Sequence, residues 1–256
     1  MNIYTGKFAG LDTTIHRWEP RAKFIGLMIL IFSFSFINSL MLLPVMILIS
    51  TLIFIASKLP FSFLLRRLSI PSFFVIAMGI FLIFFSKGTI MFKLGPLALK
   101  REGITAMILI TVRFFCILTI IVTLFETTPF LTIIKVMNSL GIPSILTDMI
   151  MFTYRYIFLV IENLLNMQMA MRLRGFRNRN LKDIVCLSSL VGSLFIRSYE
   201  QSERIYYAMV LRGYEQSENI KEEYQFKKID IVFTIAVVMI AVGMVSIQIY
   251  FNLGRV

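Results

Sequence analysis

The stretch from Phe24 to Ser57 is almost uninterruptedly apolar, and it constrains the fold more than any other feature of the sequence. At about 1.5 Å per residue in a helix, the stretch is too long for a single crossing of a membrane. The polar pair Asn38-Ser39 divides it into two segments of about 17 residues each. We therefore expect two membrane-spanning helices joined by a tight turn.

Three later apolar segments also predict membrane spans, at about residues 72–85, 103–125 and 229–251. The first of them is short and follows an amphipathic stretch bracketed by Pro60 and Pro71. Hydrophobic residues make up 58% of the 256-residue chain, which is too apolar for a soluble domain. We therefore expect an all-α membrane protein with about five transmembrane helices.

Residues 126–228 differ in kind from the spans, because charged side chains interrupt their apolar segments. A short helix is expected first, with Thr128 as its cap, Pro129 at its first position and Gly141 at its end. Two longer helices follow it. The sequence thus predicts three regions: residues 1–125 with four transmembrane helices, residues 126–228 with one short and two long cytoplasmic helices, and residues 229–256 with the last transmembrane helix.

A seven-residue motif occurs at residues 170–176 and again 38 residues later, and its copies agree at six of seven positions if Phe and Tyr are counted alike. Each copy has the residue types of a helix end: apolar residues, an arginine in the last turn, and a glycine that can take the left-handed conformation. The motif therefore predicts the ends of the two long helices, one running from about Ser144 to Arg174 and one from a cap at Asp183 to Arg212.

Two glutamates extend the repeat beyond the motif itself. Glu162 and Glu200 align at the same offset of 38 residues, each twelve residues before the arginine of its copy. The alternative interpretation is that an Arg-Gly pair simply ends a helix well. The recurrence of nearly the same seven residues favours a shared role for the two helix ends.

The distribution of cations predicts the topology. The formal net charge is +12, and 20 of the 26 Lys and Arg residues fall in segments 1–23, 58–70 and 126–228. Only five fall in the polar connector at about 87–102, which contains turn residues, and in the last five residues. The positive-inside bias therefore places the N-terminus and both motif copies in the cytoplasm. Cations in such blocks face anionic lipid or an acidic protein and not nucleic acid.

The sequence lacks the residues of a catalytic, nucleotide or metal site. No segment has the glycine and lysine spacing of a phosphate-binding loop. His16 is the only histidine, and Cys116 and Cys186 are far apart, so a transition-metal site cannot assemble from the spans. We expect no cofactor, no metal site and no enzyme activity in this chain.

Arg113 stands inside the predicted fourth span, where a charge is costly and is by default a functional candidate. The alternative is a structural role in which an acid or carbonyl groups from the cytoplasmic helices neutralise it. The structural role is favoured, because no second charge lines the spans to form a pathway.

The motif at two helix ends, after four spans and before a last one, resembles the transmembrane (T) component of energy-coupling factor transporters, prokaryotic importers of the ATP-binding cassette class. The resemblance covers nearly the whole chain, and one segment looks like the cobalt/nickel subfamily in particular. The family motif is often Ala-Arg-Gly, whereas Leu173 and Leu211 precede the arginines here. The similar segments are His16–Arg21, Thr127–Phe130, Tyr154–Tyr156 and, for the subfamily, Ser198–Arg204.

The resemblance implies a role for each helix end. The two ends would dock on two cytoplasmic ATPase subunits, identical or different, which hydrolyse the ATP. A small membrane-embedded substrate-binding (S) component would receive the motion. The ATPase-coupling residues would be Leu173, Arg174, Gly175, Leu211, Arg212 and Gly213. Apart from the resemblance, Arg113, Glu162 and Glu200 are candidates for structural or coupling roles.

The expected substrate is cobalt or nickel, in the setting of cobalamin synthesis, and the expected location is the prokaryotic cell (inner) membrane. One alternative is a shared T component for vitamin uptake. A second is a stand-alone secondary transporter, which needs ionisable residues or broken helices at mid-membrane, and Arg113 is the one such residue. A third is a membrane-anchored scaffold.

Overall fold

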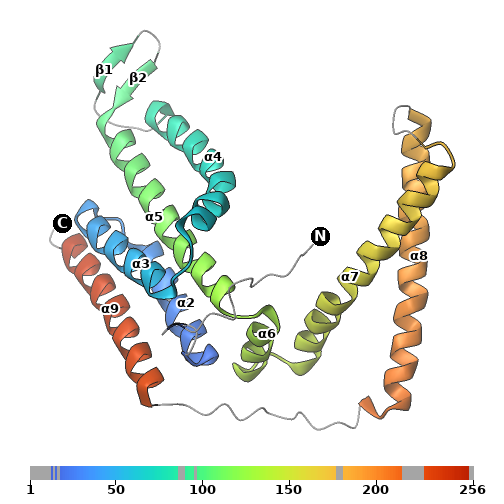
Figure 1. Cartoon of the computed structure of the whole chain (residues 1–256). Helices are drawn as coiled ribbons and strands as arrows, with labels where there is room; N and C mark the ends of the chain where they lie inside the picture. Colours follow the sequence, from blue (N-terminus) through green and yellow to red (C-terminus); the bar gives the residue numbers. More distant parts are fainter. Residues whose placement is uncertain are drawn as a thin grey trace. The chain divides into compact units, whose positions relative to one another are not determined.

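The computed structural model describes residues 13, 15, 18–85, 90–94, 97–176, 181–214 and 228–253 (Figure 1). Helices make up almost all of this part of the chain. The elements, in order, are α2 (Pro20–Phe36), η1 (Leu40–Leu42), α3 (Leu43–Ser57), α4 (Phe61–Phe85), β1 (Ile90–Leu94), β2 (Leu97–Lys100), α5 (Arg101–Thr127), α6 (Phe130–Ser139), α7 (Ser144–Leu173), α8 (Leu181–Leu211) and α9 (Lys228–Leu253).

The prediction of an all-α membrane protein with about five spans is confirmed, although the set of five helices differs from the predicted set. Among the described residues, five helical segments are long and apolar enough to cross a membrane: Leu40–Ser57, Phe61–Leu82, Gly103–Thr127, Ser144–Leu173 and Asp230–Tyr250. By length and composition α7 joins this set. Helix α2, the first predicted span, has only 17 residues.

The connector before α5 contains two strands, which the turn residues in its sequence did not predict. Strands β1 and β2 pair antiparallel, with Leu94 opposite Leu97 and Ile90 opposite Lys100, and the register shifts between Ile90 and Phe92. The turn residues Gly95 and Pro96 lie outside the described residues, as do His16 and residues 215–227.

The chain divides into two compact units. Unit 1 comprises Met1–Val136 and Tyr224–Val256, and unit 2 comprises Met137–Glu223. Unit 1 therefore holds α2 to α5 and α9, and unit 2 holds α7 and α8. Each unit is described by itself below.

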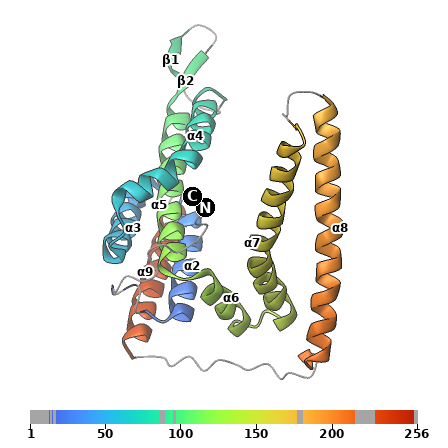
Figure 2. The same ribbon diagram turned by 45° about the vertical axis from the view of Figure 1, so that its right-hand side comes forward.

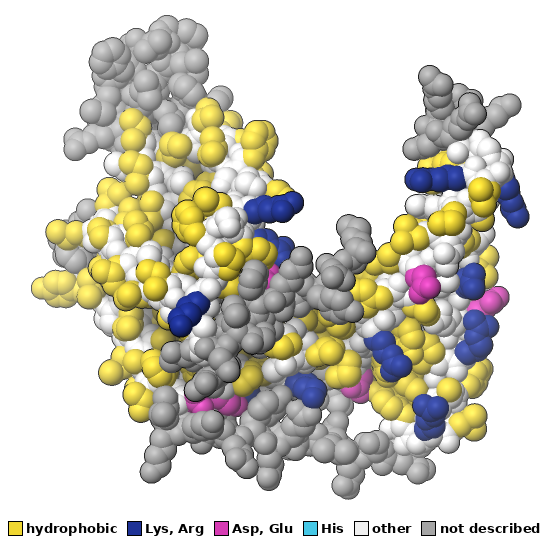
Figure 3. Space-filling model, in the orientation of Figure 1, with side chains coloured by type: hydrophobic (Ala, Val, Ile, Leu, Met, Phe, Trp, Pro, Cys, Tyr) yellow, Lys and Arg dark blue, Asp and Glu magenta, His cyan; other side chains and the backbone are white. Residues whose placement is uncertain are grey.

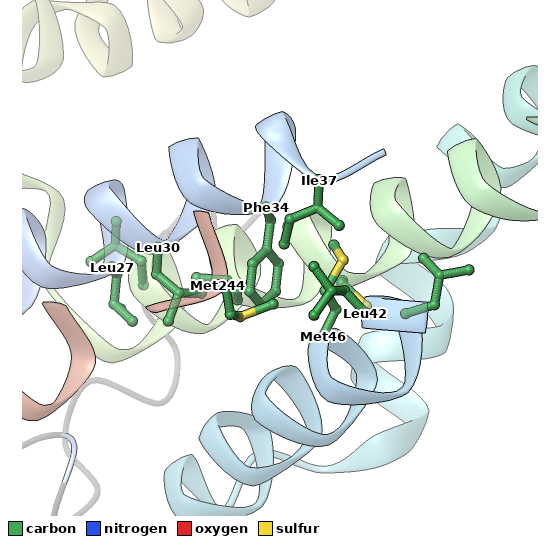
Figure 4. Packing of buried hydrophobic residues seen from close by; sticks show 11 residues of the cluster. Leu27, Leu30, Phe34, Ile37, Leu42, Met46 and Met244 are labelled. Carbon is green, nitrogen blue, oxygen red and sulfur yellow. The ribbon is translucent and has the colours of Figure 1, made fainter. Parts of the chain in front are cut away.

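Helix α5 is at the centre of unit 1, where it packs against α2, α3 and α4, while α9 packs along α2. Leu30, Phe34 and Met46 are fully buried between these helices, and Met244 of α9 closes the cluster (Figure 4). The turn between α2 and η1 falls at Asn38-Ser39, as predicted. Apolar packing between helices therefore accounts for the core of unit 1.

Helix α4 continues through Pro71, which corrects the predicted division into an amphipathic stretch and a separate span. Proline removes one backbone donor from a helix and clashes with the preceding turn. The carbonyl that loses its helical donor is that of Arg67, four residues earlier, while the Ser69 and Ser72 hydroxyls donate to the neighbouring Arg66 and Leu68 carbonyls at 3.0 and 2.7 Å.

Two predicted helix caps are also corrected. Helix α6 begins at Phe130, and the Pro129 carbonyl accepts from the Thr132 and Ile133 amides. The Thr128 hydroxyl is buried and has no hydrogen-bond partner among the described residues, so it does not cap the helix. Helix α8 begins at Leu181, which places Asp183 inside its first turn.

The end of α5 is held by buried polar side chains. The Lys23 ammonium, only 1% exposed, donates to the Thr127 carbonyl at 3.2 Å, to the Thr127 hydroxyl at 3.1 Å and to the Ile15 carbonyl at 3.3 Å. The Arg67 guanidinium pairs with the buried Glu126 carboxylate at 3.1 Å. Helices α2 and α4 therefore fix the point at which the chain leaves the bundle.

Candidate functional site

The first motif copy ends α7 in a complete glycine-terminated cap. Gly175 has a φ of +91°, and its amide donates to the Arg172 carbonyl at 3.1 Å. The Phe176 amide donates to the Met171 carbonyl at 3.2 Å. These two bonds define a Schellman motif, which satisfies the last carbonyls of a helix.

The second copy ends α8 with the same backbone turn. Gly213 has a φ of +75°, and its amide donates to the Val210 carbonyl at 2.9 Å. A Cβ atom added at Gly175 or Gly213 would meet no atom within 4 Å. Glycine is thus required here for its left-handed backbone and not for lack of space.

Both helix ends present an apolar side chain and a cation to the solvent. Leu173 is 86% exposed and Leu211 is 88% exposed, the largest exposed fractions among the described large hydrophobic residues. Arg174 and Arg212 are also exposed, and neither forms an ion pair with a described residue. An exposed leucine beside an exposed arginine suits a partner groove that is apolar and lined by a carboxylate.

Helices α7 and α8 lie side by side and run antiparallel in both views of the ribbon (Figures 1 and 2). Tyr214, just past the end of α8, donates its hydroxyl hydrogen to the Asp148 carboxylate near the start of α7. The Tyr214 ring also lies 6.5 Å from the Phe152 ring. The two motif copies are therefore at opposite ends of the pair, about 40 Å apart at 1.5 Å per residue.

Glu162 and Glu200 lie at the same level along this pair. Glu162 follows Asp148 by as many residues as Tyr214 follows Glu200, so the antiparallel register brings both to the middle. Both are exposed, and neither forms an ion pair within the part of the chain that the structure describes. The motif repeat and the helix pairing thus share one approximate two-fold axis, which passes near these two residues.

Arg113 lies in unit 1, away from the helix-end motif in the sequence. Its guanidinium Nη2 donates to the Ile37 carbonyl and to the Asn38 side-chain oxygen, the latter at 2.8 Å. Carbonyl oxygens do contact the charge, but they belong to the turn between α2 and η1 and not to the cytoplasmic helices predicted to supply them. Arg113 is therefore part of a separate site.

The two units also differ in surface chemistry. Figure 3 shows a face of unit 1 on which hydrophobic side chains predominate, with a few Lys and Arg side chains among them. On the same face of unit 2, Lys and Arg side chains recur along α7 and α8 between hydrophobic ones. This mixture of apolar and charged side chains is typical of helices that contact both apolar and polar surroundings.

Sequence reasoning missed the contact between Tyr214 and Asp148. The signal was the Tyr in the second copy where the first has Phe176, since a phenol hydroxyl in an aromatic site usually has a partner. No group of three or more His, Cys, Asp or Glu residues in the described ranges could hold a metal ion.

Comparison with known proteins gives one family. The sequence profile of the family described as CbiQ, cobalt transport protein, matches residues 12–223. A protein of Ruminiclostridium cellulolyticum named energy-coupling factor transporter transmembrane protein EcfT is 30% identical over 129 residues, 50% of this chain and 48% of that protein. A protein of the same name from Macrococcus caseolyticus is 28% identical over 216 residues, 80% of this chain and 82% of that protein.

A third relative, which is much longer than this chain, has a different name. A Bifidobacterium longum protein named as a putative ABC transporter ATP-binding protein is 30% identical over 138 residues, which are 51% of this chain and 18% of that protein.

Proposed function

From the fact that this chain belongs to the CbiQ family of cobalt transport proteins, the transmembrane (T) components of energy-coupling factor transporters, we propose that its two helix ends couple a pair of ATPase subunits to substrate import. The observation that carries this proposal is the exposed Leu-Arg-Gly sequence at each end of the α7–α8 pair. In this proposal the partner chains hydrolyse ATP, and this chain is a non-catalytic subunit of the multi-pass membrane complex.

The symmetry of unit 2 supports two similar partners. Antiparallel helices are related by a two-fold axis, and the repeated motif places equivalent residues at equivalent positions about that axis. A surface of this kind matches a dimer of identical or similar subunits, each offering the same groove. The Bifidobacterium longum relative, which is named as an ATP-binding protein and contains a similar segment, is consistent with such an association.

The chemistry of each docking site follows from its side chains. The guanidinium groups of Arg174 and Arg212 pair bidentately with a carboxylate on each ATPase subunit. Leu173 and Leu211 fill an apolar part of the same groove. Movement of the two subunits then displaces the helix ends, and α7 and α8 pass the displacement to an S component in the membrane.

The charges of α8 favour a position of both long helices on the cytoplasmic side. Helix α7 is long and apolar enough to span a membrane, but its neighbour α8 carries Arg197, Glu200, Glu203 and Arg204 near and beyond its middle. Each charge costs about 2.5–3.5 kcal/mol at the centre of a membrane helix. A pair lying along the membrane surface avoids this cost and leaves both motif copies, with the N-terminus, in the cytoplasm.

The substrate we propose is cobalt, with nickel or a vitamin as the alternatives. The match to a family described as cobalt transport protein supports cobalt. A stand-alone secondary transporter is the second class of function. It is less favoured because Arg113 is the one charge near the middle of the four candidate spans other than α7, whose other charges, Arg66, Arg67, Glu126 and Asp230, lie nearer the ends.

Co-purification tests the coupling proposal. With both ATPase subunits co-expressed, the wild type retains them, and Arg174→Ala combined with Arg212→Ala loses them together with ATP-dependent uptake. Truncating one partner of such a charge pair typically costs about 2–5 kcal/mol. The matched control is Arg172→Ala combined with Arg204→Ala, two exposed arginines outside the repeated positions, which should leave binding intact. Retention of both subunits by the double variant at the motif arginines would refute the proposal.

Labelling with a membrane-impermeant maleimide tests the orientation. Single cysteines in place of Leu173 and Leu211, in a background without Cys186, should both react in inside-out vesicles and neither in intact cells. Reaction of one cysteine from each side would mean that α7 spans the membrane. Cobalt uptake in vesicles, with nickel as competitor, then tests the substrate.

A further inference from the structure

A pocket of about 670 Å³ lies in unit 1 beside Arg113. Its lining includes the polar residues Asn38, Ser39, Thr105, Arg113 and Gln248. The remaining lining side chains are apolar and come from η1 and from the first half of α5. We call the polar lining residues the floor of the pocket and the apolar ones its wall. The proposed coupling role uses neither.

Hydrogen bonds hold the polar floor in place. The Gln248 side-chain oxygen accepts from the Ser39 amide at 3.2 Å and from the Ser39 hydroxyl at 2.8 Å, and Gln248 is only 5% exposed. Arg113 donates to the Ile37 carbonyl and to Asn38 on the other side of the turn. Helices α5 and α9 therefore fix the turn between α2 and η1 from two directions.

The charge of Arg113 lacks a counter-charge. No carboxylate of a described residue lies within 4.0 Å of its guanidinium, and its two acceptors are neutral oxygens. Its Nε–H group is buried and has no acceptor in the described ranges. A cation without a counter-charge inside a membrane span is costly, which indicates an anion from outside the chain.

The pocket lies where the short α2–α3 hairpin ends beside the longer helix α5. Helix α2 has 17 residues and the segment Leu40–Ser57 has 18, about 26 and 27 Å, against a hydrocarbon core of about 30 Å. The α5 span, Gly103–Thr127, has 25 residues, about 38 Å, and Arg113 lies about 15 Å from its start. The hairpin therefore ends against the side of a longer helix, where short spans thin the bilayer and draw its head groups inward.

We propose that this pocket binds the phosphate group of an anionic phospholipid, with Arg113 as its counter-charge. A guanidinium is well suited to phosphate oxygens, and the side-chain amide N–H groups of Asn38 can donate further hydrogen bonds at the floor. The apolar wall of α5 lies against the upper part of the acyl chains. A small phosphate ester shares the anionic chemistry but gains nothing from that wall, which is why the lipid is the expected ligand.

Thermal unfolding of the full chain in a neutral detergent tests this proposal. Dioleoyl phosphatidylglycerol should raise the unfolding temperature of the wild type by about 3–6 °C, and dioleoyl phosphatidylcholine should raise it less. Arg113→Gln should lose more than half of the phosphatidylglycerol effect. The control Arg66→Gln removes an exposed cation of α4 and should keep the whole effect. Glycerol 1-phosphate at the same concentration should have little effect.

A second variant covers the case in which Arg113→Gln does not fold. Ala106→Phe places a ring in the pocket and leaves Arg113 with both of its acceptors, and it should also lose the phosphatidylglycerol effect. An equal response to phosphatidylcholine, an equal response to glycerol 1-phosphate, or an undiminished phosphatidylglycerol response in both variants would overturn the proposal. Loss of a co-purifying membrane protein in Arg113→Gln, with the lipid response unchanged, would assign the cation to a protein partner instead.

Discussion

The two units bury their apolar side chains to very different degrees. In unit 1, Leu30, Phe34 and Met46 are fully buried among α2, α3 and α5. In the described part of unit 2, Leu190 is the one buried hydrophobic residue, while side chains such as Phe195 and Leu211 are 73% and 88% exposed. Unit 1 thus has a core of its own, whereas the apolar surface of unit 2 is large enough to mark contacts with a membrane or with other proteins.

The charged side chains follow the same division. Unit 1 uses Lys23 and the Arg67–Glu126 pair inside its packing, where they join helices. Unit 2 leaves Arg174, Arg212, Glu162 and Glu200 exposed and, among described residues, without ion pairs. The charges of Lys23, Arg67 and Glu126 therefore stabilise unit 1 internally, whereas these four charges of unit 2 remain available for binding.

Substituting one leucine in each unit is the strongest way to break this comparison. Leu30→Ala leaves a cavity in the unit 1 core and should cost about 2–5 kcal/mol of unfolding free energy. Leu173→Ala should change stability by less than about 0.5 kcal/mol and instead weaken ATPase binding. Circular dichroism melting in detergent measures the stability change of each variant, and co-purification measures the binding of the proposed ATPase subunits.

A thiol-reactive dye provides an independent readout for unit 1. Cys116 is 4% exposed in the core and Cys186 is exposed, so labelling in a Cys186→Ser background reports when the bundle opens. Equal destabilisation by Leu30→Ala and Leu173→Ala would show that unit 2 has a core not seen in the described residues.

Removing the buried cation of unit 1 should have the next largest effect. Lys23→Met keeps roughly the length and volume of the side chain but leaves the Thr127 and Ile15 carbonyls without their donor. The expected cost is about 1–3 kcal/mol, measured by the Cys116 labelling temperature. Lys58→Met, at an exposed lysine, is the control. A wild-type labelling temperature for Lys23→Met would mean that these hydrogen bonds contribute nothing net.

The glycines of the helix-end motif give a smaller effect, confined to unit 2. Gly175→Ala and Gly213→Ala force an L-residue into the left-handed region, at a cost of about 1–2 kcal/mol each. Hydrogen exchange of residues 170–176 and 208–214 should become faster. Gly192→Ala, in the middle of α8 with open space around it, should instead slow exchange slightly. Unchanged exchange at both motif glycines would contradict the role given to their backbone.

Local signals predicted much of the fold. Asn38-Ser39 marks the turn between α2 and η1 because polar residues interrupt an apolar run. Gly141, Gly175 and Gly213 mark helix ends because glycine takes a positive φ without strain, and all three have one in the structure.

What could not be predicted depends on contacts between distant segments. Pro71 lies within α4, which packs against α5, and no local pattern reveals that packing. In the sequence Lys23 lies among polar residues before the first long apolar stretch. In the structure its ammonium group donates hydrogen bonds to oxygens of Thr127, at the end of α5. The position of the two motif copies at opposite ends of one pair requires the antiparallel packing of α7 and α8, which no local pattern reveals.

The smallest expected effect separates the two helix ends from each other. Tyr214 donates to Asp148, and this hydrogen bond raises the pKa of Tyr214 to about 12, with smaller contributions from burial and from the carboxylate charge. Because the pKa in the folded state is raised, the stabilising contact is complete below about pH 10, the usual tyrosine range, and is lost as the pH rises through about 12. Phe176, at the matching position of the first copy, has no hydroxyl and makes no such contact.

Tyr214→Phe should therefore loosen the second helix end slightly and leave the first unchanged. The contact is largely exposed, so the expected change is well below about 1 kcal/mol. Faster hydrogen exchange at residues 208–214, with no change at 170–176, would show the asymmetry. The difference between the tyrosinate absorbance titrations of the wild type and Tyr214→Phe isolates this one phenol, and a midpoint near pH 10 would show that the bond to Asp148 does not form in solution. The two helix ends would then lack this difference in side-chain contact.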